Sequence, residues 1–330
     1  MPLLSDAESR TLHARILLLA FHIILLIGTV TILYPFALMV GNSIRCQVDR
    51  YDSGILPRYL WDDDALALKV AAEPYLSIGQ YNSETGSRIY SWDEIEIPDN
   101  INLAGKRMTF LTRNFRTVIS EIATHGRALY NTIIYCAMSV CAALLINPLA
   151  AYALSRYKPR CQYKVLLFCM LTMAFPPMVV AIPSFLLLRS IGLLNTYWAL
   201  ILPGIANGYT IFLLKGFFDS QPRELYEAAM LDGASEITMF WHITMALSKP
   251  ILAVIALGAF TGAYGNFMMA FILCQKESMW TLMVYLYQLQ QRSTPEVSYA
   301  ALLIAAVPTM LIFLFCQRLI IRGIVVPVDG

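Results

Sequence analysis

Charge is scarce in this sequence. Only 14% of its 330 residues are Asp, Glu, Lys or Arg, while 58% are hydrophobic. Soluble globular proteins carry about 25% charged residues, so this composition excludes a soluble enzyme and a disordered chain. The formal net charge of +2 is too balanced to indicate a nucleic-acid-binding surface. The composition therefore indicates a membrane protein.

Motifs that carry chemistry are missing as well. The chain has no phosphate-binding loop of the form G-x-x-x-x-G-K-[ST], no H-E-x-x-H, and no Ser, His and Asp at a spacing that suggests a triad. Its seven cysteines form no C-x-x-C pair and mostly lie in apolar runs, where a free thiol behaves as a small hydrophobic side chain. We therefore expect no catalytic residue and no metal site in this chain.

Six long apolar runs are present instead. Each is close to the ~20 residues that a helix needs to cross a bilayer. This predicts an all-α polytopic membrane protein with six transmembrane helices. The runs lie at 16–40, 129–154, 165–188, 198–214, 251–273 and 298–319.

The distribution of Lys and Arg predicts the orientation. Basic residues gather before the first run, after the last run, and in the second and fourth connections, whereas the short opposite loops hold few. The positive-inside rule then places both termini in the cytoplasm. The long first connection lies outside in this topology. Three parts follow: the amino terminus with helix 1 at 1–44, an extracytoplasmic insertion module at 45–126, and a five-helix core at 127–330.

The polar content of the runs bears on transport. Apart from His22, the runs contain essentially no ionisable residue, which weighs against a proton-coupled transporter. Prolines and glycines in the runs predict kinked helices. Asparagine and tyrosine side chains can bind the hydroxyls of a passing solute, or they can tie neighbouring helices together. The candidates for a substrate path are Asn131, Asn207, Tyr209, Tyr264 and Asn266.

The cytoplasmic connection at 215–250 is the most informative stretch. Ser220 is placed to cap a helix that starts near Pro222, and the following residues are good helix formers. Asp232-Gly233 ends this helix, and a second helix from about Ser235 leaves at an angle. The result is a short helix-turn-helix against the membrane, suited to fit a cleft of a partner protein.

This stretch resembles a known family. The segment E-A-A-M-L-D-G-A, followed by Phe240, Ile243, Leu247 and Pro250, is similar to the EAA loop of inner-membrane permeases of ATP-binding-cassette (ABC) importers. The preceding F-F-D-S-Q-P-R-E-L-Y-E-A-A looks like the carbohydrate importers of the maltose and sn-glycerol-3-phosphate type, and the resemblance extends over about 109–323. It implies the six-helix type I permease fold in the bacterial inner membrane, on the pattern of the second permease of the maltose system.

The resemblance also implies partners and roles. A homologous permease, two cytoplasmic ATPases that bind ATP and magnesium, and an extracytoplasmic solute-binding protein would complete the importer, with no cofactor in this chain and no nucleic acid. The insertion module is longer than this type of permease usually carries, and our hypothesis is that it contacts the binding protein or the partner permease. The loop would be the coupling helix, whose residues Glu227, Ala228, Ala229, Asp232 and Gly233 would enter the ATPase cleft.

Alternatives remain at this stage. The solute is expected to be a carbohydrate, but a sugar phosphate or an acidic oligosaccharide is the alternative. A membrane scaffold that transports nothing, and a secondary transporter, are further rivals. The chain also departs from the family pattern at Met245-Ala246, where Leu-Pro is usual, at Tyr264-Gly265-Asn266-Phe267, and in its last four residues. The first departure bears on the bend of the second loop helix, the second on the substrate path, and the third on contacts of the tail with the ATPase.

Overall fold

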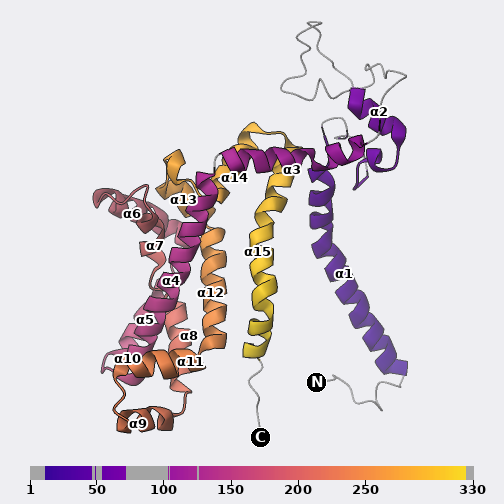
Figure 1. Cartoon of the computed structure of the whole chain (residues 1–330). Coiled ribbons are helices and arrows are strands. Elements are labelled where there is room, and N and C mark those ends of the chain that lie inside the picture. The colour runs from indigo at the N-terminus through magenta and orange to yellow at the C-terminus, as the bar shows by residue number, and fades with distance from the viewer. Residues whose placement is uncertain are drawn as a thin grey trace. The chain divides into compact units, whose positions relative to one another are not determined.

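The computed structural model describes residues 12–46, 49, 54–71, 103, 105–124 and 126–324. Within these residues the secondary structure is helical and no strand occurs. The chain divides into two compact units, whose helices are labelled in Figure 1. Unit 1 is Met1–Ser120 with Arg292–Ile304, and unit 2 is Glu121–Gln291 with Ala305–Gly330. The predicted division at 45 and 127 rests on membrane topology and stays a prediction.

Helix α1, Leu12–Ser43, opens unit 1. Its segment Leu18–Ser43 has a mean hydropathy of 2.4 and is long and apolar enough to cross a membrane. Every residue at 18–36 is exposed. A helix that is apolar on all sides is typical of a membrane span, so the first predicted span is confirmed as one continuous apolar helix.

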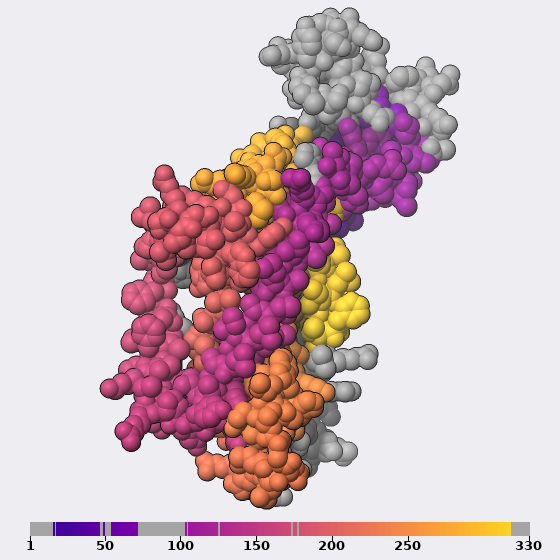
Figure 2. All heavy atoms as spheres, turned by 60° about the vertical axis from the view of Figure 1, so that its left-hand side comes forward, coloured from indigo at the N-terminus to yellow at the C-terminus, as the bar shows by residue number. Residues whose placement is uncertain are grey.

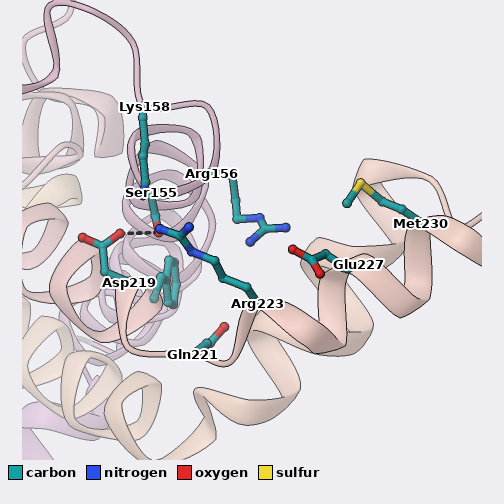
Figure 3. Close-up of a pocket in the computed structure, with 9 residues that line it drawn as sticks. Ser155, Arg156, Lys158, Asp219, Gln221, Arg223, Glu227 and Met230 are labelled. Atoms are coloured by element: carbon teal, nitrogen blue, oxygen red, sulfur yellow. Dashed lines mark hydrogen bonds between the residues drawn. The ribbon is translucent and has the colours of Figure 1, made fainter.

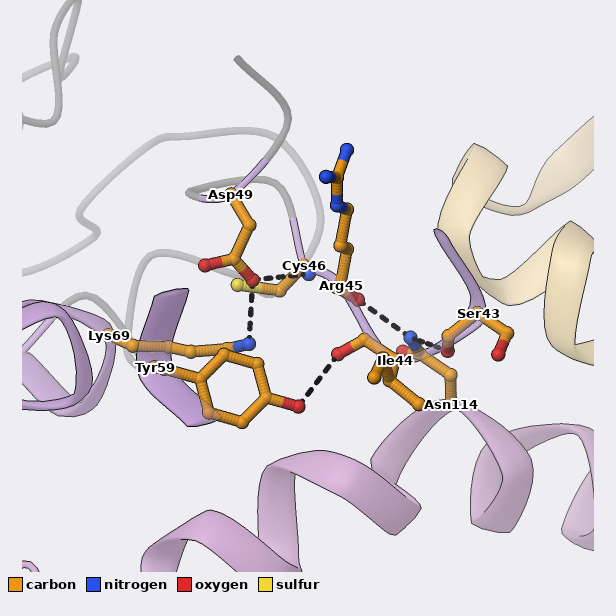
Figure 4. A network of polar contacts seen from close by, with 8 residues as sticks. All are labelled: Ser43, Ile44, Arg45, Cys46, Asp49, Tyr59, Lys69 and Asn114. Atoms are coloured by element: carbon orange, nitrogen blue, oxygen red, sulfur yellow. Dashed lines mark hydrogen bonds and ion pairs between the residues drawn. The ribbon is translucent and has the colours of Figure 1, made fainter. Parts of the chain in front are cut away.

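A buried polar cluster holds the end of α1 (Figure 4). The elements around it are η3, Arg58–Leu60, α2, Asp63–Ala71, and α3, Lys106–Thr124. Lys69 Nζ lies 2.7 Å from Asp49 Oδ2, with side chains only 1% and 6% exposed, and 3.5 Å from the ring centroid of Tyr59. Asn114 Nδ2 donates to the carbonyls of Ser43 and Arg45, at 2.7 Å each. Burial of a charge is tolerated here because it is paired.

Helix α4, Arg127–Arg156, is the centre of unit 2. Helices α8, Gly208–Asp219, and α12, Lys249–Tyr264, pack along it, and α5, Gln162–Met173, packs on α8. The approach of α5 to α8 is close, because a Cβ on Gly208 would lie 2.3 Å from the carbonyl oxygen of Cys169. A glycine is therefore required where these two helices meet.

Three of the six predicted runs are not single helices. The run at 165–188 is split into α5 and α6, Pro177–Ser190. The run at 198–214 comprises α7, Tyr197–Ile201, η6, Leu202–Gly204, and α8, with a bend of 52°. The run at 251–273 is α12 and α13, Phe267–Leu273, separated by Gly265 and Asn266. These runs are therefore interrupted, in agreement with the kinks that proline and glycine predicted.

Proline explains two of the interruptions. Proline has no N–H and clashes with the preceding turn. The first break falls at Pro176-Pro177, and α7 ends at Ile201, just before Pro203. In the described chain, three helices are long and apolar enough to cross a membrane: Leu18–Ser43, Arg127–Arg156 and Pro295–Gln317. The number rises to five if each of two bent pairs counts as one span, the second pair being Glu236–Leu247 with Lys249–Tyr264, bent by 83°.

The remaining elements connect these helices. Between α8 and α12 lie α9, Arg223–Leu231, α10, Glu236–Met239, the π-helical turn η7, Phe240–Thr244, and α11, Met245–Leu247. Figure 1 shows them at the end of unit 2 where α4 ends and α5 begins. After α13 come η8, Glu277–Met279, α14, Leu282–Arg292, and α15, Pro295–Ile324. Helices α4 and α15 confirm the second and sixth predicted runs.

Candidate functional site

Helix α9 has sharply defined ends. It begins after Pro222, whose ψ of 130° is not helical, and proline at this position loses no helical hydrogen bond. Its carboxyl end is a Schellman motif: Gly233 N donates to Met230 O at 3.1 Å and Ala234 N to Ala229 O at 2.9 Å. Gly233 has φ of +78°, a conformation that glycine adopts without strain. The predicted helix and its end at Asp232-Gly233 are confirmed.

One predicted cap is wrong. Ser220 does not begin α9, because α8 continues to Asp219 and Ser220 ends that helix. The Ser220 hydroxyl donates back to the carbonyl of Phe217 at 2.7 Å. By contrast, the second helix begins at Ser235 as predicted: Ser235 caps α10, and its hydroxyl accepts from Thr238 N at 3.2 Å. A serine hydroxyl can either accept from a backbone N–H at the start of a helix or donate to a carbonyl of the preceding turn, so the sequence around Ser220 did not decide between the two ends.

Most of α9 is exposed. Among its residues only Tyr226 is buried, and Ala229 is half-buried. Three large apolar side chains are exposed: Leu225 by 44%, Met230 by 51% and Leu231 by 90%. Figure 2 shows the α9 to α11 segment, in orange, at the lower end of this face of the molecule. Apolar side chains grouped on an exposed polar-flanked element mark an interaction surface.

Tyr226 anchors α9 to the rest of unit 2. Its hydroxyl donates to Gln221 Oε1 and forms a 2.7 Å hydrogen bond with Thr244 Oγ1. Gln221 Nε2 donates to Ser248 Oγ at 3.0 Å, and Ser248 Oγ donates to Thr244 O at 2.6 Å. All four side chains are at least nine-tenths buried. This Tyr226 network links α9 to η7 and to the start of α12, so these elements form one packed body.

A polar pocket of about 310 Å³ lies between the ends of α4 and α8 and the start of α9 (Figure 3). The Arg156 guanidinium lies 3.6 Å from the ring centroid of Tyr226 and faces the carboxylate of Glu227. Asp219 accepts from Ser155 Oγ at 2.7 Å. The lining residues are Ser155, Arg156, Lys158, Phe218, Asp219, Gln221, Arg223, Glu227 and Met230. With three cations and two carboxylates, the pocket can receive a charged side chain from a partner.

The structure brings the five predicted coupling residues together at one end of unit 2. Glu227, Ala228 and Ala229 lie on α9, and Asp232 and Gly233 form its carboxyl end. Sequence reasoning did not find the buried anchors. Tyr226 lies within the quoted motif, but no spacing rule connects it to Thr244, 18 residues further along the chain, or connects Gln221 to Ser248. Only the fold brings them within hydrogen-bonding distance.

Asn131, a substrate-path candidate, lies near the start of α4 and is buried. Its Nδ2 donates to the carbonyls of Ser278 at 2.9 Å and Trp280 at 3.0 Å. Its Oδ1 accepts from the hydroxyl of Tyr197 at 2.7 Å. These bonds fix the segment that follows α13 against α4. A role of Asn131 in a substrate path stays a prediction.

The other path candidates lie on separate elements. Asn207 caps α8 and accepts from the backbone N–H of residue 210 at 2.9 Å. Tyr264 donates to a carbonyl of α15 at 2.7 Å, and Asn266 donates to a tyrosine hydroxyl of α4 at 2.8 Å. Tyr209 is 53% exposed. Tyr264 and Asn266 therefore tie neighbouring elements together. This is one of the two roles that the sequence left open, the other being contact with a solute.

The fold and the exposed helix define the class. The chain is an all-α polytopic membrane protein with the type I permease fold of ABC importers. Residues 127–326, more than half of the chain, match the family of binding-protein-dependent transport system inner membrane components. The chain belongs to this family.

Curated relatives are similar over part of the chain. LplC of Bacillus subtilis (strain 168) is 35% identical over 161 residues, which cover 44% of this chain and 55% of LplC. The probable ABC transporter permease YurM of the same organism is 34% identical, over 59% of this chain and 66% of YurM. The maltodextrin transport system permease MalD of Streptococcus pneumoniae (strain ATCC BAA-255 / R6) is 30% identical, over 64% of this chain and 77% of MalD. The chain thus spans less than two thirds of the length of LplC and YurM.

A solved structure has the same fold over nearly the whole chain. It is a chain of a bacterial ABC transporter involved in the import of the acidic polysaccharide alginate. The TM-score is 0.65 with 21% sequence identity, and the match covers 96% of this chain and 99% of the other. At this identity the likeness establishes the fold.

Proposed function

We propose that this chain is one permease subunit of a bacterial ABC importer for a carbohydrate. It pairs with a homologous permease, receives solute from an extracytoplasmic binding protein, and is driven by two cytoplasmic ATPases that bind ATP and magnesium. Both termini lie in the cytoplasm, on the side of α9. The observation that carries this proposal is α9 itself. It is an exposed helix that carries the family motif, and its one buried side chain, Tyr226, bonds it to the rest of unit 2.

The names of relatives support the solute class. MalD belongs to a maltodextrin transport system, and GanQ of Bacillus subtilis (strain 168), 33% identical over 56% of this chain, to one for galactooligosaccharides. The acidic alternative also has support. YtcP of the same organism, a permease of a polygalacturonan/rhamnogalacturonan transport system, is 27% identical over 76% of this chain. We propose a saccharide cargo in either case.

In this proposal α9 is the coupling helix. Glu227, Ala228, Ala229, Asp232 and Gly233 contact the ATPase, together with the exposed Leu231. The polar pocket behind α9 offers Arg156 and Glu227 for charge-assisted hydrogen bonds with the ATPase. Displacement of α9 by the ATPase would move η7 and the start of α12 with it, because the Tyr226 network joins them.

The test uses Leu231, which is 90% exposed and therefore not needed for folding. Leu231→Asp places a charge on the proposed contact, and Leu231→Met is the matched control that keeps an apolar side chain. Loss of an interface hot spot costs about 2 kcal/mol or more, so we expect roughly 30-fold weaker retention of the ATPases by Leu231→Asp. Copurification from membranes and uptake in proteoliposomes measure this. Wild-type ATPase retention and uptake by Leu231→Asp would contradict the coupling role of α9.

A further inference from the structure

A second pocket lies at the opposite end of α4 from α9. It has a volume of about 400 Å³ and is formed by the end of α3, the start of α4, the segment around η8, and α14. In the proposed orientation this end of α4 is extracytoplasmic. The lining residues are Thr124, Gly126, Arg127, Ala128, Glu277, Ser278, Trp280 and Tyr285. Small-molecule sites commonly enclose about 300–1,000 Å³, so the volume suits a sugar unit.

The segment that forms one wall is fixed in place. Asn131 Nδ2 binds the carbonyls of Ser278 and Trp280. Just before this wall, Lys276 N donates to Asn195 Oδ1 at 2.8 Å, and just after it, the backbone N–H of residue 282 donates to a threonine hydroxyl of α4 at 2.7 Å. A site whose walls are already ordered loses less entropy when a ligand binds. The pocket is therefore preformed.

The floor of the pocket is aromatic, and the polar group of its tyrosine already has a hydrogen-bond partner. Tyr285 is 1% exposed, and its hydroxyl donates to the Glu121 carboxylate at 3.1 Å. Trp280 lines the same pocket and is partly exposed. An aromatic ring offers an apolar face with a polar edge, and the C–H face of a pyranose packs on such a surface. Trp280 is the side chain available for this contact.

Polar groups with planar geometry surround the aromatic floor. Arg127 begins α4 and Glu277 begins η8, and both are exposed within the pocket. A guanidinium donates two parallel hydrogen bonds and a carboxylate accepts two, which matches the adjacent hydroxyls of a sugar. Ser278 adds a hydroxyl. The charges of Arg127 and Glu277 cancel, so the lining of the pocket carries no net charge, which suits a neutral ligand better than an anion.

We propose that this pocket binds one unit of a neutral saccharide at the extracytoplasmic end of α4. Trp280 stacks on the sugar ring, Arg127 donates to its hydroxyls, and Glu277 accepts from them. The inference rests on the proposed function for the orientation and the solute class, and it goes further by placing a neutral-sugar site on this chain itself. A site with these charges selects against uronates.

Binding is tested on the full chain in nanodiscs, without partners. The neutral probe is maltotriose and the acidic probe is trigalacturonate, both followed by saturation-transfer difference NMR. We expect maltotriose to bind, and trigalacturonate to bind at least about tenfold more weakly, as repulsion worth about 1.4 kcal/mol gives. Trp280→Leu removes the signal, whereas Trp280→Phe keeps an aromatic face and retains it in part.

Glu277→Gln gives the sharpest result. It weakens maltotriose binding about tenfold or more by removing a charged acceptor, and it improves trigalacturonate binding because one negative charge is gone. The proposal is overturned if trigalacturonate binds the wild type better, if Trp280→Leu and Glu277→Gln leave both probes unchanged, or if neither probe binds. The last result, with a crosslink from residue 277 to the binding protein, would assign the pocket to a protein contact.

The assembled importer separates the two proposals. If the complex with its ATPases hydrolyses ATP in response to loaded binding protein, yet maltotriose does not bind the chain, the pocket inference fails and the proposed function stands. If maltotriose binds the chain in a Trp280-dependent way but no ATPase associates with it, the pocket stands and the proposed function fails.

Discussion

Gly233 offers a test of the proposed coupling role of α9. It has φ of +78° and closes the Schellman motif that ends α9. A Cβ built on Gly233 meets no heavy atom of the described chain within 4 Å. A substitution therefore costs only backbone strain within this chain. That cost is about 1–2 kcal/mol for alanine, less for asparagine and more for valine.

The variants Gly233→Asn, Gly233→Ala and Gly233→Val form a graded series. A strain of about 1–2 kcal/mol changes a conformational equilibrium roughly 5- to 30-fold, so the fraction of correctly ended α9 falls in the order Gly, Asn, Ala, Val. We expect ATP hydrolysis stimulated by loaded binding protein, and uptake in proteoliposomes, to fall in the same order. Basal hydrolysis of the ATPases is the control, and we expect it to stay the same because no loaded binding protein is sensed through α9 in its absence.

Two outcomes would refute the reasoning. If Gly233→Val couples hydrolysis to uptake as the wild type does, the left-handed turn is not required. If Gly233→Asn is as damaging as Gly233→Val, strain does not decide the effect. In that case a partner surface must approach the glycine so closely that any side chain is excluded.

Two further predictions concern packing in each unit. In unit 1, Lys69→Met leaves the buried Asp49 carboxylate without its cation and lowers the free energy of unfolding by about 3–5 kcal/mol. Adding Asp49→Asn recovers part of this stability because neither charge remains. Thermal unfolding in detergent measures both variants, and additive losses of stability would contradict the pairing. In unit 2, Gly208→Ala forces α8 away from Cys169 and costs about 1–3 kcal/mol. Gly258→Ala, where a Cβ meets nothing within 4 Å, is the control, and equal unfolding temperatures for the two variants would show that α5 and α8 are not in close contact.

The π-helical turn contributes a hydrogen-bonding group that holds α9 in place. The turn η7, Phe240–Thr244, lies directly behind α9 and supplies Thr244 to the Tyr226 network. The next helices meet at Ser248, where the axis bends by 83°. Single π-turns insert an extra residue into a helix and are common at functional sites. Here the turn brings a hydroxyl to the tyrosine that anchors the exposed helix.

Local sequence determined much of this protein. Runs of apolar residues specify helices in any apolar environment, so α1, α4 and α15 were predicted nearly to their ends. Proline and glycine act within one turn, so the start of α9 at Pro222 and its end at Gly233 were predictable. The EAA-like motif pointed to the family that the comparisons established.

Tertiary structure decided the rest. The partners of Asn131 and Asn266 depend on which elements lie next to one another. The Tyr226 network joins residues up to 27 positions apart, and the pocket at the start of α4 joins that helix to a segment about 150 residues later. Sequence periodicity describes one helix at a time, whereas a hydrogen bond between helices exists only once packing has brought both of its groups within about 3 Å.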